Sequence, residues 1–241
     1  MKSYYDTYWE PEDWIGSRFS GRLRNILEKH VRGAAVLDAG CGDGGTYGTW
    51  LASVARSYAG VDISARAVER ARARGLAAQE IDELAALPFP DASFDAVVCV
   101  EVLEHLLFPM EAVRELGRVL RPNGVFIATV PNMAYWRRRL DIAVFGQFHP
   151  LGTAEGARRP WQDPHLRFFT RRSFRRLFVE AGFACRVVGI NGSLFGDLPF
   201  LGRRFGSAQL SRPFDWLEIL WPALFGSNLC AIAVKPAVAD R

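Results

Sequence analysis

The chain has 241 residues, 49% of them hydrophobic, and a formal net charge of +4. This length and hydrophobic content exclude an intrinsically disordered protein and predict one large domain whose core is stable without disulfide bonds. The positive charge is mild and weighs against a nucleic-acid-binding protein, which needs a strongly basic surface.

The cysteines and the first residues give expectations about the compartment. Cys41, Cys99, Cys185 and Cys230 lack the C-x-x-C spacing of zinc sites, and their distribution indicates no disulfide framework. Residues 1–6 contain no apolar segment of the kind found in signal peptides. No run reaches the ~18 uncharged apolar residues that a membrane-spanning helix needs. The sequence therefore predicts a cytoplasmic protein.

The N-terminal part of the chain is predicted to be helical. Residues 1–14 are rich in tyrosine and tryptophan. Residues 13–31 place apolar side chains at helical spacing, with basic residues opposite. This pattern predicts a helix that packs its apolar side on a sheet.

From residue 34 onward, predicted strands and helices alternate. The strands are expected at residues 34–39, 57–62, 77–81, 95–100, 125–130, 183–190 and 229–234. The helices are expected at residues 45–55, 65–74, 110–120, 134–145, 171–181 and 213–221. This alternation predicts an α/β fold with a doubly wound, mostly parallel sheet. Right-handed crossovers bring the carboxyl ends of parallel strands, and any motifs on them, to one edge of the sheet.

A glycine-rich turn follows the first of these strands. Gly40, Gly42 and Gly44 come after the buried run that ends near Asp38, and a helix comes next. Glycines let a ligand approach the backbone N–H groups of such a turn. The spacing differs from that of the dinucleotide fingerprint, and a turn with Asp38 and Asp43 but no Lys or Arg disfavours a phosphate ligand. The alternative is a strand–helix connection that binds nothing.

A second acid, Asp62, ends the second predicted strand. A carboxylate there, in a strand–helix–strand unit, can accept hydrogen bonds from both hydroxyls of a ribose. Together with the glycine turn, this acid resembles the first two motifs of the class I S-adenosylmethionine-dependent methyltransferases, and the resemblance covers residues 34–183. It implies a Rossmann-like sheet of about seven strands in the order 3-2-1-4-5-7-6, with the last strand antiparallel and S-adenosylmethionine as cofactor.

The resemblance also implies which residues contact the cofactor. Asp62 is expected on the ribose, and Ile63 beside the adenine ring. Asp82 is expected near the adenine amino group, with Glu83 as the alternative, and the backbone N–H of Leu84 is expected to face the ring. The full expected set is Asp38, Gly40, Gly42, Gly44, Asp62, Ile63, Asp82, Leu84 and Glu101.

Two carboxylates and an imidazole follow the fourth predicted strand. Glu101, Glu104 and His105 have the i, i+3, i+4 spacing that places side chains on one face of a helical turn. One interpretation is that Glu101 contacts the cofactor while the other two make local hydrogen bonds. The other is a divalent metal site, Mg²⁺ or Mn²⁺, in which His165 from a later loop at the same sheet edge joins these three residues.

The turn with its later histidine resembles small-RNA 3′-end methyltransferases and ubiquinone-pathway O-methyltransferases, which use a bound metal to orient hydroxyl groups. A further interpretation is that a histidine acts as the catalytic base without a metal. Glu101, His105 and His165 are therefore the expected catalytic residues.

The segment after the fifth strand resembles the MetW-like branch, among methyltransferase types 11 and 23. Residues 131–140, Gly146 and residues 165–170 carry this resemblance. The run Arg137 to Arg139 either binds an anionic substrate group or forms a solvated helix face. The apolar residues within 194–225 either pack on the last strands, cover the substrate, form a dimer surface or make a peripheral membrane contact.

The sequence thus predicts a single methyltransferase domain, residues 1–241. Its expected parts are an N-terminal helical cap (1–31), a cofactor-binding core (32–132), a substrate-side elaboration (133–228) and the last strand (229–235). In the families it resembles, such a cap often covers the pocket. The expected reaction is methylation of a hydroxyl of a small molecule or glycan, since a hydroxyl gives the base or metal a role. The alternatives are a non-catalytic MetW-like partner or regulatory protein, and an RNA-modifying methyltransferase.

Overall fold

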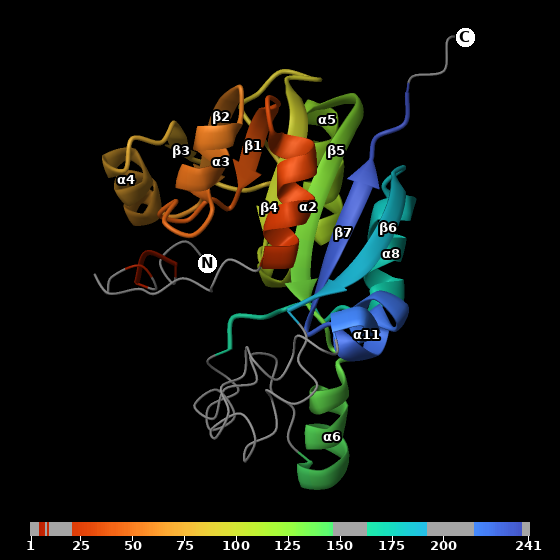
Figure 1. Ribbon diagram of the computed structural model, residues 1–241. Helices are drawn as coiled ribbons and strands as arrows, with labels where there is room; N and C mark the ends of the chain where they lie inside the picture. Colours follow the sequence, from red (N-terminus) through yellow and green to blue (C-terminus); the bar gives the residue numbers. More distant parts are fainter. Residues whose placement is uncertain (1–4, 8, 10–20, 147–162, 192–214, 238–241) are drawn as a thin grey trace.

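The computed structural model describes residues 5–7, 9, 21–146, 163–191 and 215–237. This part contains one mixed sheet flanked by helices (Figure 1). Its strands are β1 (Ala35–Ala39), β2 (Ser57–Asp62), β3 (Ala78–Glu80), β4 (Phe94–Val100), β5 (Leu120–Pro131), β6 (Ala184–Ile190) and β7 (Asn228–Val234). Its helices are α2 (Gly21–Val31), α3 (Gly48–Val54), α4 (Ala65–Ala73), α5 (Pro109–Val119), α6 (Trp136–Phe145), α8 (Arg171–Glu180), α11 (Asp215–Leu220) and α12 (Pro222–Phe225), with a 3₁₀ turn, η1 (Leu103–His105).

The seven strands lie in the order β3-β2-β1-β4-β5-β7-β6. The pairs among β1 to β5 are parallel, and β7 is antiparallel to both β5 and β6. The predicted fold class and strand order are therefore confirmed. The parallel strands end at the lower edge of the sheet in Figure 1, so the segments that follow β1, β2, β4 and β5 meet there.

Both faces of the sheet are buried, which is why its central strands are almost continuously apolar. In β4, Val97 and Cys99 face the core formed with α5 and α8, and Ala96 and Val98 face the core formed with α2 and α3. Figure 1 shows α2 and α3 on the near face, with α5 and α8 behind the sheet. The predicted inward side of the N-terminal helix is also observed, since α2 buries Leu23, Leu27 and Val31.

Some predicted boundaries are wrong. The helix expected from residue 45 begins at Gly48, because the glycine turn occupies the residues before it. The fifth strand was expected from residue 125, but β5 begins at Leu120, which pairs with Phe94 before the register shifts and Val125 pairs with Ala96. Residues 121–124 lie at this irregularity within the strand. Residues 13–20 of the predicted N-terminal helix lie outside the described part.

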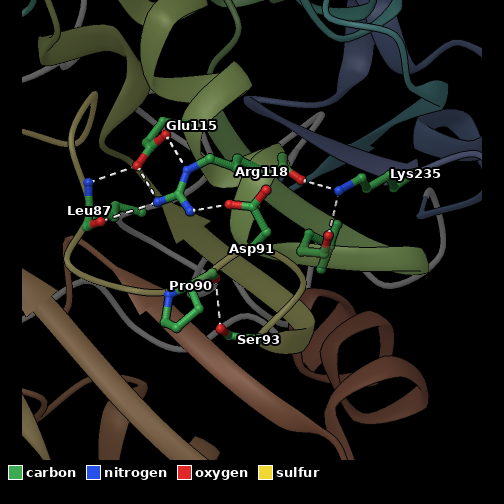
Figure 2. A network of polar contacts seen from close by, with 9 residues as sticks. Leu87, Pro90, Asp91, Ser93, Glu115, Arg118 and Lys235 are labelled. Atoms are coloured by element: carbon green, nitrogen blue, oxygen red, sulfur yellow. Dashed lines mark hydrogen bonds and ion pairs between the residues drawn. The ribbon is translucent and has the colours of Figure 1, made fainter.

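An ion-pair network fastens the loop before β4 to α5 (Figure 2). The Arg118 guanidinium donates to the carboxylates of Glu115 and Asp91 and to the carbonyl of Leu87. Glu115 also accepts the backbone N–H of Leu87 at 2.8 Å. The hydrogen bonds from Arg118 are the main reason that the pKa of Glu115 is lowered from its ordinary value. This network fixes the strand that leads to the carboxyl edge of the sheet.

The predicted roles of the C-terminal apolar region stay open. In α11 and just after it, Ile219, Leu220 and Trp221 are all more than half exposed, at 67%, 69% and 64%. Residues 192–214, which carry much of the predicted region, lie outside the described part. Among the described helices, none is long and apolar enough to cross a membrane. The division of the chain into a cap, a core and a substrate-side part stays a prediction.

Candidate active site

The turn between β1 and α3 is held by backbone hydrogen bonds to β2. The N–H groups of Gly40 and Cys41 both donate to the carbonyl of Val61, at 2.8 and 3.0 Å. Gly40 and Gly42 adopt left-handed conformations, with φ of 79° and 54°. Since other residues rarely adopt these angles, the sequence of the turn follows from its shape.

Asp62 joins this turn to the start of α4. One carboxylate oxygen accepts the N–H of Gly42 and the other accepts the N–H of Ser64, each at 2.9 Å. Ser64 caps α4, because its hydroxyl oxygen accepts the N–H of Ala67. Burial raises the pKa of Asp62, and the backbone hydrogen bonds oppose that rise. The acid at the end of β2 therefore organises the turn, in addition to its expected contact with a ribose.

Described residues near the N-terminus lie against the same turn. The hydroxyl of Ser64 donates to the Asp6 carboxylate at 2.7 Å. The Trp9 ring is 7% exposed, and a Cβ at Gly42 would lie 2.7 Å from it. These contacts place Asp6 and Trp9 against the glycine turn, and the role of the N-terminal segment as a cover stays a prediction.

Asp38 lies near the end of β1, just before the glycine turn. Its carboxylate is buried and accepts a hydrogen bond from the Tyr58 hydroxyl at 2.9 Å. Burial raises the pKa of Asp38 to about 7, and the hydrogen bond from Tyr58 opposes that rise. Near neutral pH this acid is poised between its charged and neutral forms.

Asp38→Asn should flatten the dependence of folding stability on pH between about 4 and 7. The folded pKa of Asp38, about 7, lies above its ordinary value of 3.8, so in this window the native protein holds a proton that the unfolded chain releases. The contribution of Asp38 is fully present below about pH 4 and is lost as the pH rises through about 7, by at most about 4 kcal/mol. Chemical denaturation of the wild type and of Asp38→Asn, each near pH 4 and near pH 8, measures how much of the free energy of unfolding is lost between the two pH values. An equal pH dependence in the variant and the wild type would contradict the prediction.

The residues expected around the adenine ring lie beside β2 and β3. Ile63 is half-buried against the core, and Leu84 is buried in it. The N–H of Ile81 donates to the carbonyl of Asp62 at 3.0 Å, which brings the end of β3 next to the ribose acid. Asp82 and Glu83 are both exposed, so the choice between them stays a prediction.

Among the described residues, Glu101 is not part of the group whose ligand atoms come together. Its φ of 55° is left-handed, and its two carboxylate oxygens accept hydrogen bonds from the Thr129 hydroxyl (2.7 Å) and the Asn228 amide (2.9 Å). The expectation that Glu101, Glu104 and His105 share one helical face is wrong. Of this segment, Leu103–His105 is helical, as the 3₁₀ turn η1, and Glu101 lies before that turn with a left-handed backbone.

Glu104, His105 and His165 do come together, although 60 residues separate the two segments that carry them. One ligand atom from each lies within 4.8 Å of the others. The Nε2 atoms of both histidines lie 3.8 Å from the same Glu104 carboxylate oxygen. The two rings stack with centroids 4.6 Å apart, and the Tyr5 ring meets His105 edge-on.

Burial governs the ionisation of this cluster. It lowers the pKa of His105 to about 4, so the imidazole is neutral near pH 7. It also raises the pKa of Glu104 well above its ordinary value, and the neighbouring Glu101 carboxylate raises it further. A buried acid beside two imidazoles is an arrangement that can bind a cation or accept a proton.

The loop that carries His165 is fixed to the turn that carries Glu104. The carbonyl of Glu104 accepts the N–H groups of Leu166 and Arg167, each at 2.9 Å. His165 Nδ1 lies 2.6 Å from the Asp163 carboxylate, and His105 Nδ1 lies 3.2 Å from the Pro164 carbonyl. Both rings are therefore oriented through Nδ1, with Nε2 directed towards Glu104.

Sequence reasoning missed Asp163 and Asn228. Asp163 precedes His165 by two residues, and an acid so close to a candidate histidine was an available signal for a partner of its ring. Asn228 opens β7 and binds Glu101 across 127 residues of chain. No local pattern reveals that contact, since it depends on β7 lying beside β5.

The arginine run at the start of α6 makes contacts within the protein. Arg137 pairs with Asp141 at 3.0 Å, and Arg138 donates to the carbonyls of Asn132 and Ser227. Arg139 donates to the carbonyl of Ala134. These bonds give the arginines a structural role at the end of β5, which does not require an anionic substrate.

Comparisons with known proteins agree with this geometry. Residues 37–128 match the family model described as a methyltransferase domain. A probable S-adenosylmethionine-dependent methyltransferase of Mycobacterium tuberculosis (strain ATCC 25618 / H37Rv) is 46% identical over 150 residues, which are 61% of this chain and 48% of that protein. A ubiquinone biosynthesis O-methyltransferase of Xanthomonas oryzae pv. oryzae (strain PXO99A) is 36% identical over 109 residues, 42% of this chain and 44% of that protein. The chain thus spans about half the length of these curated relatives.

A solved structure shares the fold over most of its length. The S-adenosylmethionine-dependent methyltransferase from Archaeoglobus fulgidus superimposes with a TM-score of 0.62 and 19% sequence identity. The alignment covers 89% of this chain and 91% of that one. The likeness therefore extends beyond the matched residues 37–128 to the arrangement of the whole sheet.

Proposed function

We propose that this chain is a class I S-adenosylmethionine-dependent methyltransferase, as the match of residues 37–128 and the curated relatives support, and that it methylates a hydroxyl group of a small molecule or glycan. In this reaction the bond from the donor sulfur to the methyl carbon breaks. A bond from that carbon to the acceptor oxygen forms, and the hydroxyl loses its proton. S-adenosylhomocysteine is the second product.

The residues at the carboxyl edge of β1 and β2 fit the cofactor. The Val102 side chain leaves no room for a side chain at Gly40, where a Cβ would lie 2.4 Å from it. The methionine part of the cofactor would lie against this turn, near Asp38, and the ribose hydroxyls would bind Asp62. The oxygens of Asp62 each accept one backbone N–H, and a carboxylate oxygen can accept a second hydrogen bond. When bound, the cofactor supplies a methyl group that its sulfonium already activates.

The single observation that favours a hydroxyl acceptor is the cluster of Glu104, His105 and His165. Because the methyl group is already activated, a methyltransferase mainly has to align donor and acceptor and exclude water. A neutral amine attacks without further help, whereas a hydroxyl becomes a good nucleophile only when its proton is removed or its oxygen binds a metal. The cluster offers either means of activation.

The comparisons with known proteins support a methyltransferase, and one relative supports a hydroxyl acceptor. The Xanthomonas oryzae relative is named as an O-methyltransferase of ubiquinone biosynthesis. The alternative of a non-catalytic regulatory protein is less well supported, because the glycine turn and Asp62 keep the hydrogen-bonding arrangement that a cofactor needs. An RNA substrate is less well supported, because a net charge of +4 is mild for a protein that binds nucleic acid.

Two measurements on the wild-type protein test the proposal. Calorimetry with S-adenosylmethionine should show one site per chain. Incubation with methyl-labelled S-adenosylmethionine and a panel of sugars and phenols should then label at least one hydroxyl compound, while amines of matched size stay unlabelled. Labelling of amines alone would overturn the assignment to hydroxyls, and the absence of cofactor binding would overturn the enzymatic role.

A further inference from the structure

Tyr58, on β2, is a partly buried side chain near the glycine turn, and the expected cofactor contacts give it no role. In the parallel pair of β1 and β2, Val36 pairs with Tyr58 and Asp38 pairs with Gly60. All four residues therefore face the same side of the sheet, because side chains alternate along each strand. Since Gly60 has no side chain, Tyr58 can reach across it, and its hydroxyl donates to the Asp38 carboxylate at 2.9 Å.

Two glycines leave the space that this hydroxyl occupies. A Cβ on Gly60 would lie 2.9 Å from the Tyr58 hydroxyl oxygen, and a Cβ on Gly48, the first residue of α3, would lie 3.0 Å from it. A side chain at either position would push the hydroxyl away from its place beside Asp38. The Tyr58 ring also packs against the apolar clusters that contain Val36 and Ala71. The phenol is therefore held in position from both ends.

The hydroxyl of Tyr58 acts on Asp38 as a permanent donor. Burial, and next the Asp38 carboxylate, raise the pKa of Tyr58, so the phenol stays protonated. Burial likewise raises the pKa of the Cys41 thiol in the turn and of the Cys99 thiol on β4, which both stay neutral. The pKa of Asp38 is raised by burial and by the Asp62 carboxylate, and it is lowered by the hydrogen bond from Tyr58. Of these described neighbours, Tyr58 is the one that favours the charged form of Asp38.

We propose that Tyr58 is a positioning residue of the cofactor site, whose hydroxyl holds the Asp38 carboxylate in place to receive the ammonium group of S-adenosylmethionine. This inference rests on the proposed function, which places the methionine part of the cofactor near Asp38. A carboxylate has lone pairs for several donors, so the bond from Tyr58 leaves Asp38 able to accept the ammonium group. The ammonium group is charged up to about pH 8, and a carboxylate attracts it where a protonated acid does not.

The experiment compares two ligands on the full chain and on Tyr58→Phe, which keeps the ring and removes only the hydroxyl. Calorimetry at pH 7 should show that S-adenosylhomocysteine, which retains the amino group, binds the variant about 10-fold more weakly. 5′-Methylthioadenosine, which has neither the amino nor the carboxyl group, should bind both proteins within about twofold. Tyr135→Phe, the same substitution before α6, should leave both affinities unchanged. Equal losses for the two ligands in Tyr58→Phe would show a merely structural role and overturn the inference.

A double substitution tests whether Tyr58 acts through Asp38. In the Asp38→Asn background, adding Tyr58→Phe should weaken the binding of S-adenosylhomocysteine by less than about twofold, because no carboxylate remains for the hydroxyl to hold. Losses that multiply, as for two independent sites, would refute the link between the two residues.

The pH dependence of binding gives a further readout. Without the hydroxyl the pKa of Asp38 rises further, so on acidification Tyr58→Phe should lose its affinity for S-adenosylhomocysteine about one pH unit earlier than the wild type. An unchanged acid limb, or wild-type affinity at pH 7 in Tyr58→Phe, would overturn this inference and leave the proposed function standing. A wild-type protein that binds neither S-adenosylmethionine nor S-adenosylhomocysteine would overturn both.

Discussion

His165→Asn should lower the rate of methyl transfer to a hydroxyl by a factor of about 10²–10⁴. Under the proposed function the side chain at this position either takes the proton of the hydroxyl or helps to bind a metal ion, and its Nε2 lies 3.8 Å from the Glu104 carboxylate in a buried site. Asparagine can perform neither task as well as imidazole. The affinity for S-adenosylmethionine should stay within about threefold of the wild type, because the expected cofactor contacts lie on other segments.

Steady-state kinetics with the hydroxyl compound identified in the labelling screen measure this effect, and calorimetry gives the cofactor affinity. His30→Asn is the control for the substitution itself. A variant with the wild-type rate would show that His165 has no part in the reaction. Parallel losses of rate and cofactor affinity would show instead that His165 only supports the fold.

Asp62→Ala should weaken the binding of S-adenosylmethionine by at least about 100-fold. Two charge-assisted hydrogen bonds to the ribose would be lost, each contributing about 1.5–3 kcal/mol at most. The structure adds a second cause, because the same carboxylate holds the N–H groups of Gly42 and Ser64 in place. The variant therefore loses both a ligand contact and part of the order of the turn.

Calorimetry measures the dissociation constant, and thermal unfolding separates the two causes. Asp62→Asn keeps an oxygen that can accept one of the backbone bonds, so it should be more stable than Asp62→Ala while still binding the cofactor weakly. Glu69→Ala, which removes an exposed acid from the neighbouring helix α4, is the charge-matched control. Wild-type affinity in Asp62→Ala would remove Asp62 from the cofactor site.

The sheet could be predicted from the sequence because its signals are local. Apolar runs that end in Asp38 and Asp62, with a glycine turn between them, mark two strands and a helix independently of the rest of the chain. The resemblance then supplied the order of the strands. The early start of β5 could not be predicted, because it depends on the pairing of Leu120 with Phe94 across the sheet.

The candidate site could be predicted only in part, because its geometry depends on distant contacts. The spacing of Glu101, Glu104 and His105 placed them correctly at the end of β4, but no propensity indicated the left-handed backbone of Glu101. The meeting of His165 with Glu104 follows from two backbone hydrogen bonds between segments 60 residues apart. Such bonds leave no trace in the residue types that make them, since any residue but proline offers a backbone N–H.

The place of β7 in the sheet has a consequence for the order of folding. β6 has no neighbour other than β7 in the described sheet, and β7 lies between it and β5. During synthesis, β6 therefore leaves the ribosome with nothing to pair with, and it must wait until β7 follows. A nascent chain stalled with β6 outside the ribosome and β7 still inside it should have first five strands that resist protease, while β6 is cut. The hydrogen bond from the Asn228 amide to the Glu101 carboxylate can therefore form only after β7 has been synthesised.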